Sequence, residues 1–204
     1  MEKPKNNVWL WWLVGGGAVA LSATAAITNP TSRKLIKRTI KTVADIILKP
    51  EQLAMIKTLN PSVQATAIAF INRIETETGY SVIITSANRT FAKQAALKKE
   101  NPKNAAAGAS KHNFGVAWDI NLYQGKTFVR KADSKEKWLN TGVPQIAASM
   151  GLKWGGMAFE GYYDPVHFEV PIPLSKLVAL KQQQKVEGNL IKLPQDILNQ
   201  YKLA

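Results

Sequence analysis

The two histidines of the chain lie in similar settings, each close to acidic and apolar residues. His112 stands seven residues before Asp119 in the segment SKHNFGVAWDI, and His167 stands between two acids in DPVHFEV. Two imidazole nitrogens and one carboxylate oxygen are a ligand set that holds a catalytic zinc ion and leaves its fourth position for water. If His112, Asp119 and His167 converge in the folded chain, the sequence predicts a metal site of this kind.

Hydrolysis at such a site also requires a group that carries a proton. Zinc lowers the pKa of bound water from about 15.7 to about 7, and a neighbouring carboxylate can then accept the proton. Asp164 lies three residues before His167 and Glu169 lies two residues after it, so both are candidates. The chain has no cysteine and no HExxH motif, which excludes thiolate metal sites, disulfides and the familiar zincin arrangement.

The alternation of residue types predicts two strands that carry these side chains. Residues 114–122 alternate between large apolar residues and a second face on which Asp119 is flanked by small residues. Residues 166–170 form another short strand, on which His167 and Glu169 share one face. If the two strands pair, we expect their polar faces to meet at one point.

The remaining sequence predicts helices around this sheet. Asn60 and Pro61 are typical of the start of a helix, and Gly79 is typical of its end. Other expected elements are a basic amphipathic helix at 33–48, a strand at 80–85, a helix at about 90–99, a loop at 100–110, a helix at 145–150 and helical segments in 172–204. We therefore expect an α+β fold: a small antiparallel sheet that carries the zinc site, flanked by helices, with an N-terminal membrane-spanning or signal helix.

Residues 8–27 form an uncharged segment of 20 residues, about the length that a helix needs to cross a bilayer. Three tryptophans lie near its beginning, where aromatic rings favour the membrane interface. Residues 23–25, Ala-Thr-Ala, resemble a signal-peptidase site. The segment is therefore either a retained anchor or a cleaved signal, and its length favours the anchor.

The net charge of +13 suggests an anionic partner, although a basic surface can also serve solubility alone. The candidates are nucleic acid, membrane lipid and an acidic cell-wall polymer. We expect no nucleic-acid binding, because the cations are scattered and no nucleic-acid-binding motif accompanies them. The basic run at residues 33–41 would, by the positive-inside rule, keep the following domain in the cytoplasm.

Two motifs resemble those of a known enzyme family. They are SxHxxGxAxD at residues 110–119 and DxxHFE at residues 164–169. Together they are similar to the zinc metallopeptidase family of D-alanyl-D-alanine carboxypeptidases and L-alanyl-D-glutamate endopeptidases, which includes VanY-type and VanX-type enzymes and many phage endolysins. SANRTFAKQ at 86–94 and WGG at 154–156 also resemble stretches of the family, and the resemblance spans roughly residues 50–170.

The resemblance implies a role for each site residue. His112, Asp119 and His167 would be ligands of Zn²⁺, Asp164 the catalytic base, and Arg89 the group that steadies an oxyanion or a substrate carboxylate. The residues expected to support the site or to contact substrate are Ser110, Gln94, Glu169 and Trp154. An aspartate three residues before the second histidine is more similar to the endopeptidase branch of the family than to the VanX-like branch.

These observations give an expected domain plan and function. The plan is a tail (1–7), a transmembrane anchor or signal segment (8–27), a basic amphipathic helix or linker (28–49), a zinc peptidase domain (50–171) and a C-terminal helical extension (172–204). We expect a monomeric peptidase of peptidoglycan stem peptides, with a phage or prophage endolysin as one possible origin. The alternative is a non-catalytic, membrane-anchored, zinc-stabilised cell-wall-binding module.

The expected location is the cell envelope, because peptidoglycan lies outside the cytoplasmic membrane. The chain would be anchored in the inner membrane or exported, with its catalytic domain on the periplasmic or extracellular side. The basic run at 33–41 conflicts with this location. Three explanations remain open: an N-terminal segment that leaves the bilayer, as in signal-arrest-release endolysins, folding of residues 33–47 against the domain, or a cytoplasmic pool that awaits a holin.

Overall fold

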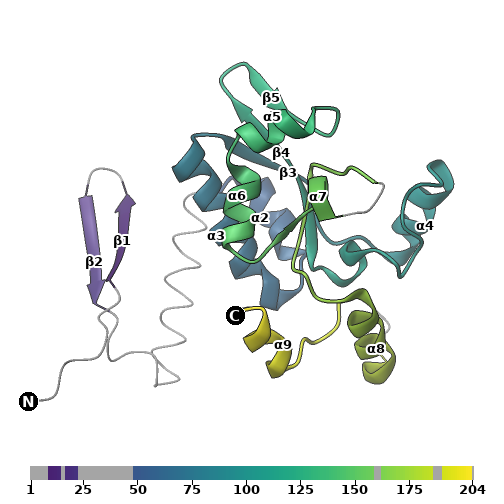
Figure 1. The fold of residues 1–204 in the computed structure, drawn as a ribbon. Coiled ribbons are helices and arrows are strands. Elements are labelled where there is room, and N and C mark those ends of the chain that lie inside the picture. The colour runs from purple at the N-terminus through teal and green to yellow at the C-terminus, as the bar shows by residue number, and fades with distance from the viewer. Residues whose placement is uncertain (1–8, 15–16, 23–47, 159–161, 186–189, 204) are drawn as a thin grey trace, which may run out of the picture. The chain divides into compact units, whose positions relative to one another are not determined.

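A computed structural model describes residues 9–14, 17–22, 48–158, 162–185 and 190–203 (Figure 1). The chain divides into two units, Met1–Ile47 and Leu48–Ala204. The tail at residues 1–7 lies outside the described residues, as do residues 23–25 and, apart from Leu48, the helix predicted over 33–48. Those predictions stay predictions.

The first unit contains a pair of antiparallel strands where the sequence predicted a helix. Strand β1 (Trp9–Val14) pairs with β2 (Gly17–Ser22), with Trp9 opposite Ser22 and Val14 opposite Gly17. The membrane-spanning or signal helix expected over residues 8–27 is therefore wrong for residues 9–14 and 17–22. No helix in the described part of the chain is long and apolar enough to span a bilayer. Tryptophan and valine favour strands, and each glycine in the run at 15–17 costs a helix about 1 kcal/mol.

The second unit contains a five-stranded antiparallel sheet (Figure 1). The strand order is β3–β4–β7–β6, and β5 pairs with β4. The strands are β3 (Ser81–Ser86), β4 (Ala117–Gln124), β5 (Thr127–Val129), β6 (Lys153–Trp154) and β7 (His167–Glu169). The predicted pairing of the Asp119 strand with the His167 strand is confirmed.

Helices surround the sheet, with α2, α3 and α6 gathered beside it (Figure 1). The α-helices are α2 (Pro50–Lys57), α3 (Pro61–Thr78), α4 (Phe91–Glu100), α5 (Lys135–Asn140), α6 (Val143–Ser149), α7 (Gly155–Ala158), α8 (Leu174–Gln184) and α9 (Gln195–Gln200). A 3-10 helix, η1, covers Lys111–Phe114. The expected α+β class, a small antiparallel sheet flanked by helices, is confirmed.

Helix α3 begins and ends where the sequence predicted. The side chain of Asn60 accepts a hydrogen bond from the Ser62 amide at 3.2 Å, as an N-cap does, and Pro61 follows in the first helical turn. Gly79 adopts the left-handed conformation, with φ of 70°, that favours glycine at a helix C-terminus. The helix therefore presents one apolar face to the sheet, which includes the fully buried Phe70.

The core contacts decide which face of the sheet carries the polar residues. Trp118 on β4 and Phe168 on β7 are opposite each other in the strand register, and both are fully buried. The ring of Phe70 lies 6.1 Å from that of Trp118 and 5.0 Å from that of Phe168. Because neighbouring side chains on a strand point to opposite faces, Asp119 and His167 point away from this aromatic cluster.

The segment before β4 differs from the prediction. Residue 114 was expected in a strand, but η1 ends there and Gly115 takes a left-handed conformation with φ of 65°. A Cβ atom at Gly115 would lie 2.5 Å from the Asn60 backbone nitrogen and 2.7 Å from Leu190 Cδ2. Both the left-handed conformation and the lack of space for a Cβ atom require a glycine here. The glycine lets the chain turn from η1 into the strand that carries Asp119.

Candidate metal centre

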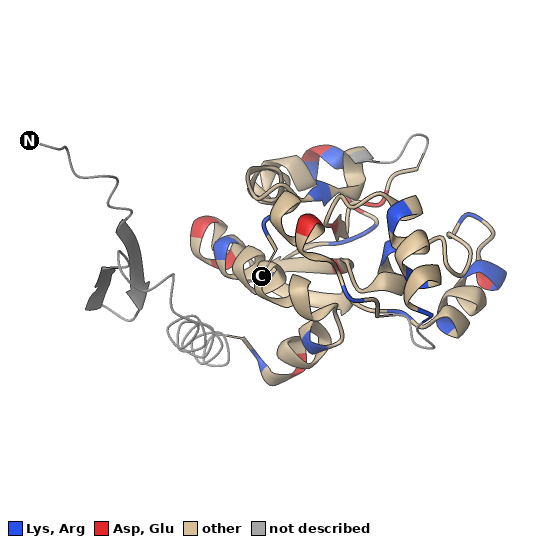
Figure 2. Cartoon of the chain, turned by 90° about the horizontal axis from the view of Figure 1, so that it is seen from below, with Lys and Arg blue, Asp and Glu red and all other residues tan. Residues whose placement is uncertain are grey.

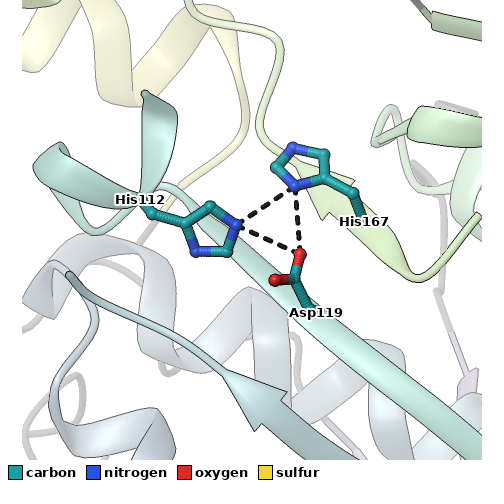
Figure 3. Close-up of side chains that lie close together, drawn as sticks. All are labelled: His112, Asp119 and His167. Carbon is teal, nitrogen blue, oxygen red and sulfur yellow. Dashed lines mark hydrogen bonds and ion pairs between the residues drawn. The ribbon is translucent and has the colours of Figure 1, made fainter. Parts of the chain in front are cut away.

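Three side chains from three elements meet at one point, as Figure 3 shows. The atoms that face one another are His112 Nε2, Asp119 Oδ1 and His167 Nδ1, and each of the three separations is 3.1 Å. All three residues are buried. The predicted convergence of these residues is what the structure contains.

The sheet and η1 fix the three positions. Asp119 lies on β4 directly opposite His167 on β7, and on its other side it pairs with Ser86 at the end of β3. His112 lies on η1, where its carbonyl accepts hydrogen bonds from the amides of Arg89 at 3.0 Å and Gly115 at 3.2 Å. Two of the corners are thus set by strand register and the third by a short helical turn.

The hydrogen bonds on the outer side of each ring determine which nitrogen faces the centre. His112 Nδ1 donates to the carbonyl of Ala87 at 2.6 Å, and His167 Nε2 donates to Glu169 Oε2 at 3.1 Å. A carbonyl and a carboxylate only accept, so the protons of the neutral rings lie on those outer nitrogens. The inner nitrogens then direct lone pairs at each other and at Asp119 Oδ1, an arrangement that a cation stabilises.

The dimensions of the triangle suit zinc. Ligands about 2.0–2.2 Å from a tetrahedral ion lie roughly 3.3–3.6 Å apart. The separations of 3.1 Å between the inner atoms of His112, Asp119 and His167 are close to that value. Nitrogen and oxygen donors in this number are also the set that zinc accepts in catalytic sites. The residues present therefore fit the metal that the family resemblance implies.

The pKa shifts of Asp119 and His167 also favour a positive charge in the centre. Burial would raise the pKa of the Asp119 carboxyl, but the two imidazoles lower it well below its usual range. Burial lowers the pKa of His112. Burial also opposes charge on His167, yet its hydrogen bonds to Asp119 and Glu169 outweigh that effect and raise its pKa to about 9. The buried carboxylates thus draw one positive charge into the centre, which a proton or a metal ion can supply.

Arg89 lies against the aspartate corner. Its guanidinium donates to Asp119 Oδ2, to Ser86 Oγ at 2.8 Å and to Gln94 Oε1 at 3.4 Å. Gln94 is itself buried and donates to the carbonyl of Ala105 at 2.8 Å. In this arrangement Arg89 holds the carboxylate of Asp119 and Gln94 holds the guanidinium of Arg89. Contact of Arg89 with an oxyanion or a substrate stays a prediction.

Asp164 lies at the turn that leads into β7, outside the three-residue cluster of donor atoms. Its backbone carbonyl accepts from the His167 amide at 3.1 Å, and its Oδ1 lies 3.1 Å from Lys131 Nζ. Lys131 is therefore an ion-pair partner of Asp164, but the angles between their atoms are not those of a hydrogen bond. The role of Asp164 as a base stays a prediction.

Trp154 supports the same turn. Its indole Nε1 donates to the carbonyl of Pro165 at 2.7 Å. A Cβ atom at Gly156 would lie 2.2 Å from the Trp154 ring, so the backbone passes too close for a side chain there. The WGG segment therefore positions the turn between Asp164 and His167, which gives Trp154 a structural function beside the predicted substrate contact.

Several neighbours of the site were not found from the sequence. Lys111 Nζ lies 3.0 Å from Glu169 Oε1, next to the ring of His167. Asn113 is fully buried and donates to the Arg89 carbonyl at 2.8 Å, while its Oδ1 accepts from Gly108 at 2.9 Å. Ser110, which was predicted, is buried, and its carbonyl accepts from the Asn113 amide at 2.9 Å. The only signal for the missed residues was their adjacency to His112.

The chain is similar to a known protein family and to a solved structure. Residues 103–170 match a family model described as D-alanyl-D-alanine carboxypeptidase, which confirms the family resemblance of the two motifs. A crystal structure of the L-Ala D-Glu endopeptidase ChiX of Serratia marcescens matches with a TM-score of 0.45 and 15% identity, over 60% of this chain and 87% of that chain. None of the curated proteins matches the chain.

Proposed function

We propose that the chain, whose residues 103–170 match this family model, is a zinc-dependent hydrolase of peptidoglycan stem peptides. The single observation that carries the proposal is the triangle of His112 Nε2, Asp119 Oδ1 and His167 Nδ1, with all sides at 3.1 Å. Three buried donor atoms this close together need a positive charge among them, and a metal ion bound by all three would supply it.

The residues around the triangle divide the remaining work. A bound zinc ion would supply Lewis acidity and make a water molecule acidic enough to attack near neutral pH. His112, Asp119 and His167 would hold the ion, and Arg89 keeps the Asp119 carboxylate in place. The Asp164 carboxylate, three residues before His167, is the proposed acceptor of the proton of the attacking water.

The preferred bond is that between L-alanine and D-glutamate, with D-alanyl-D-alanine as the alternative. The preference rests on the motif DxxHFE at residues 164–169, which resembles the endopeptidase branch. Because this substrate lies outside the cytoplasmic membrane, we place the chain at the cell envelope, where a phage endolysin would also act. Lysine and arginine are spread over the helices and loops of the second unit (Figure 2), and the net charge of +13 favours adhesion to anionic wall polymer.

A digestion experiment tests the proposal. The full-length chain, loaded with Zn²⁺, is incubated with purified peptidoglycan, and the released fragments are identified by mass spectrometry. New ends between L-alanine and D-glutamate support the endopeptidase, whereas free D-alanine supports the carboxypeptidase. A zinc-loaded protein that produces no new ends contradicts a peptidase, and binding to the wall without cleavage would favour the wall-binding module.

A further inference from the structure

Lys111 has no role in the motifs, yet it contacts Glu169, which accepts a hydrogen bond from the proposed ligand His167. We propose that Lys111 and Glu169 form a positioning pair, which orients the imidazole of His167 towards the metal ion. This inference rests on the proposed metal site and adds two residues that act on it through a ligand.

A continuous chain of contacts joins Lys111 to the centre. Lys111 Nζ lies 3.0 Å from Glu169 Oε1, and the other carboxylate oxygen, Oε2, accepts from His167 Nε2 at 3.1 Å. The second nitrogen of the same ring, Nδ1, faces the centre. A hydrogen bond at one ring nitrogen fixes both the tautomer and the rotation of the ring, and so aims the lone pair of the other nitrogen.

Burial gives this pair its strength. The side chain of Glu169 is only 5% exposed and that of Lys111 only 14%. A buried carboxylate oxygen without a partner is costly, and Lys111 provides the partner for Oε1, the oxygen of Glu169 that does not bond His167. The pair of Lys137 and Asp133 is different, because those side chains are 41% and 23% exposed and such a surface pair contributes little.

The positions of the two residues in the chain matter as much as their charges. Lys111 directly precedes His112 on η1, and Glu169 is the last residue of the three-residue strand β7, which begins with His167. The ion pair therefore ties η1 to β7, the two elements that place His112 Nε2 and His167 Nδ1 3.1 Å apart. Loss of the pair would free the ring of His167 and loosen η1 against the strand.

The sign of the effect separates positioning from simple electrostatics. Removal of a lysine near a cation site removes repulsion and would strengthen metal binding if charge alone mattered. Positioning predicts the opposite result. Substitution of residues that orient a metal-binding histidine typically weakens metal affinity by about 10- to 100-fold.

The test measures metal binding by the full-length chain and needs no activity. Zn²⁺ dissociation constants are obtained by competition with a chelating dye for the wild type, Lys111→Met, Lys111→Arg, Glu169→Gln and the double variant Lys111→Met/Glu169→Gln. Lys137→Met is the matched control, because it removes a lysine from an exposed ion pair in which none of the three proposed ligands takes part. The absorption spectrum of the Co²⁺-substituted proteins reports the geometry of the ligands directly.

We expect Glu169→Gln to weaken Zn²⁺ binding by about 10- to 100-fold. Lys111→Met should weaken it too and shift the Co²⁺ spectrum, while Lys111→Arg and Lys137→Met should resemble the wild type. The double variant should bind no more weakly than Glu169→Gln, because Lys111 acts only through Glu169.

Three results would overturn the inference: unchanged affinity in Lys111→Met, tighter binding in Lys111→Met, or additive losses in the double variant. Circular dichroism checks folding, and if Glu169→Gln does not fold, the comparison of Lys111→Met with Lys111→Arg decides. A wild type that binds no Zn²⁺ would overturn the proposed function itself. A wild type that binds Zn²⁺ as tightly as all the variants would overturn only the positioning pair.

Discussion

Asp119 and His167 are directly opposite each other in the β4–β7 ladder, and their inner atoms, Oδ1 and Nδ1, are 3.1 Å apart. The residues before and after this pair follow from the same register. Trp118 lies opposite Phe168 and is packed into the aromatic core on the other face of the sheet. The buried core thus anchors the two strands, and through them it sets the positions of two of the three proposed ligands.

Arg89 should be needed for metal affinity in a way that lysine cannot replace. Its guanidinium bonds Asp119, Ser86 and Gln94 together, and a lysine ammonium lacks the planar fork for this arrangement. We expect both Arg89→Met and Arg89→Lys to weaken Zn²⁺ binding by about 10- to 100-fold in a chelator competition assay.

Arg73→Met is the matched control for the Arg89 variants. Arg73 also bonds a carboxylate, that of Glu77, but both side chains lie on the surface, at 40% and 45% exposure. Its replacement should leave Zn²⁺ affinity unchanged. If Arg89→Lys bound Zn²⁺ like the wild type, the proposed hold on Asp119 would be wrong.

Gly115→Ala should destabilise the protein and disturb the position of His112. The left-handed conformation costs a residue with a Cβ atom about 1–2 kcal/mol, and the new methyl would also clash with the Asn60 backbone. Urea denaturation should give a loss in the free energy of unfolding of more than about 2 kcal/mol. Zn²⁺ affinity should fall as well, because η1 must shift.

Gly125→Ala separates the two causes of that loss. Gly125 also has a positive φ, of 58°, but no heavy atom lies within 4 Å of the position that its Cβ would take. This variant should lose only the conformational term, about 1–2 kcal/mol, and keep its Zn²⁺ affinity. Equal losses in both variants would show that close packing at Gly115 does not matter.

Asp164→Asn should separate chemistry from metal binding. The asparagine keeps the size of the side chain and cannot accept a proton, so kcat for stem-peptide cleavage should fall by about 100- to 10,000-fold. Zn²⁺ content should stay unchanged, because Asp164 lies outside the cluster of donor atoms. Asp133→Asn, at a surface carboxylate paired with Lys137, should cleave normally. An Asp164→Asn variant with full activity would assign the proton to another group.

The sequence predicted that Asp119 and His167 converge because strand alternation is a local property. Once residues 114–122 and 166–170 are assigned to strands, the side chains of Asp119 and His167 are placed on one face if the strands pair. The two ends of α3 could also be predicted, because Asn60 and Gly79 cap the helix through their own conformation and contacts with nearby backbone atoms.

The failures have physical causes of a different kind. The helix prediction for residues 8–27 rested on the length and apolar character of the segment. It gave too little weight to the strand preference of tryptophan and valine and to the cost of three glycines in a helix. The contacts of Lys111 with Glu169, and of Arg89 with Asp119, join residues that are 58 and 30 positions apart. No alternation of residue types linked the members of these two pairs, so only the folded chain reveals their contacts.

Metal content of the purified full-length protein tests the central claim most directly. Elemental analysis of the wild type should find about one zinc ion per chain, and His167→Ala, which removes one of the three donors, should retain little or none. The two samples must be purified in parallel and shown by circular dichroism to be folded. Equal zinc in both proteins, or none in a folded wild type supplied with Zn²⁺, would contradict the metal centre.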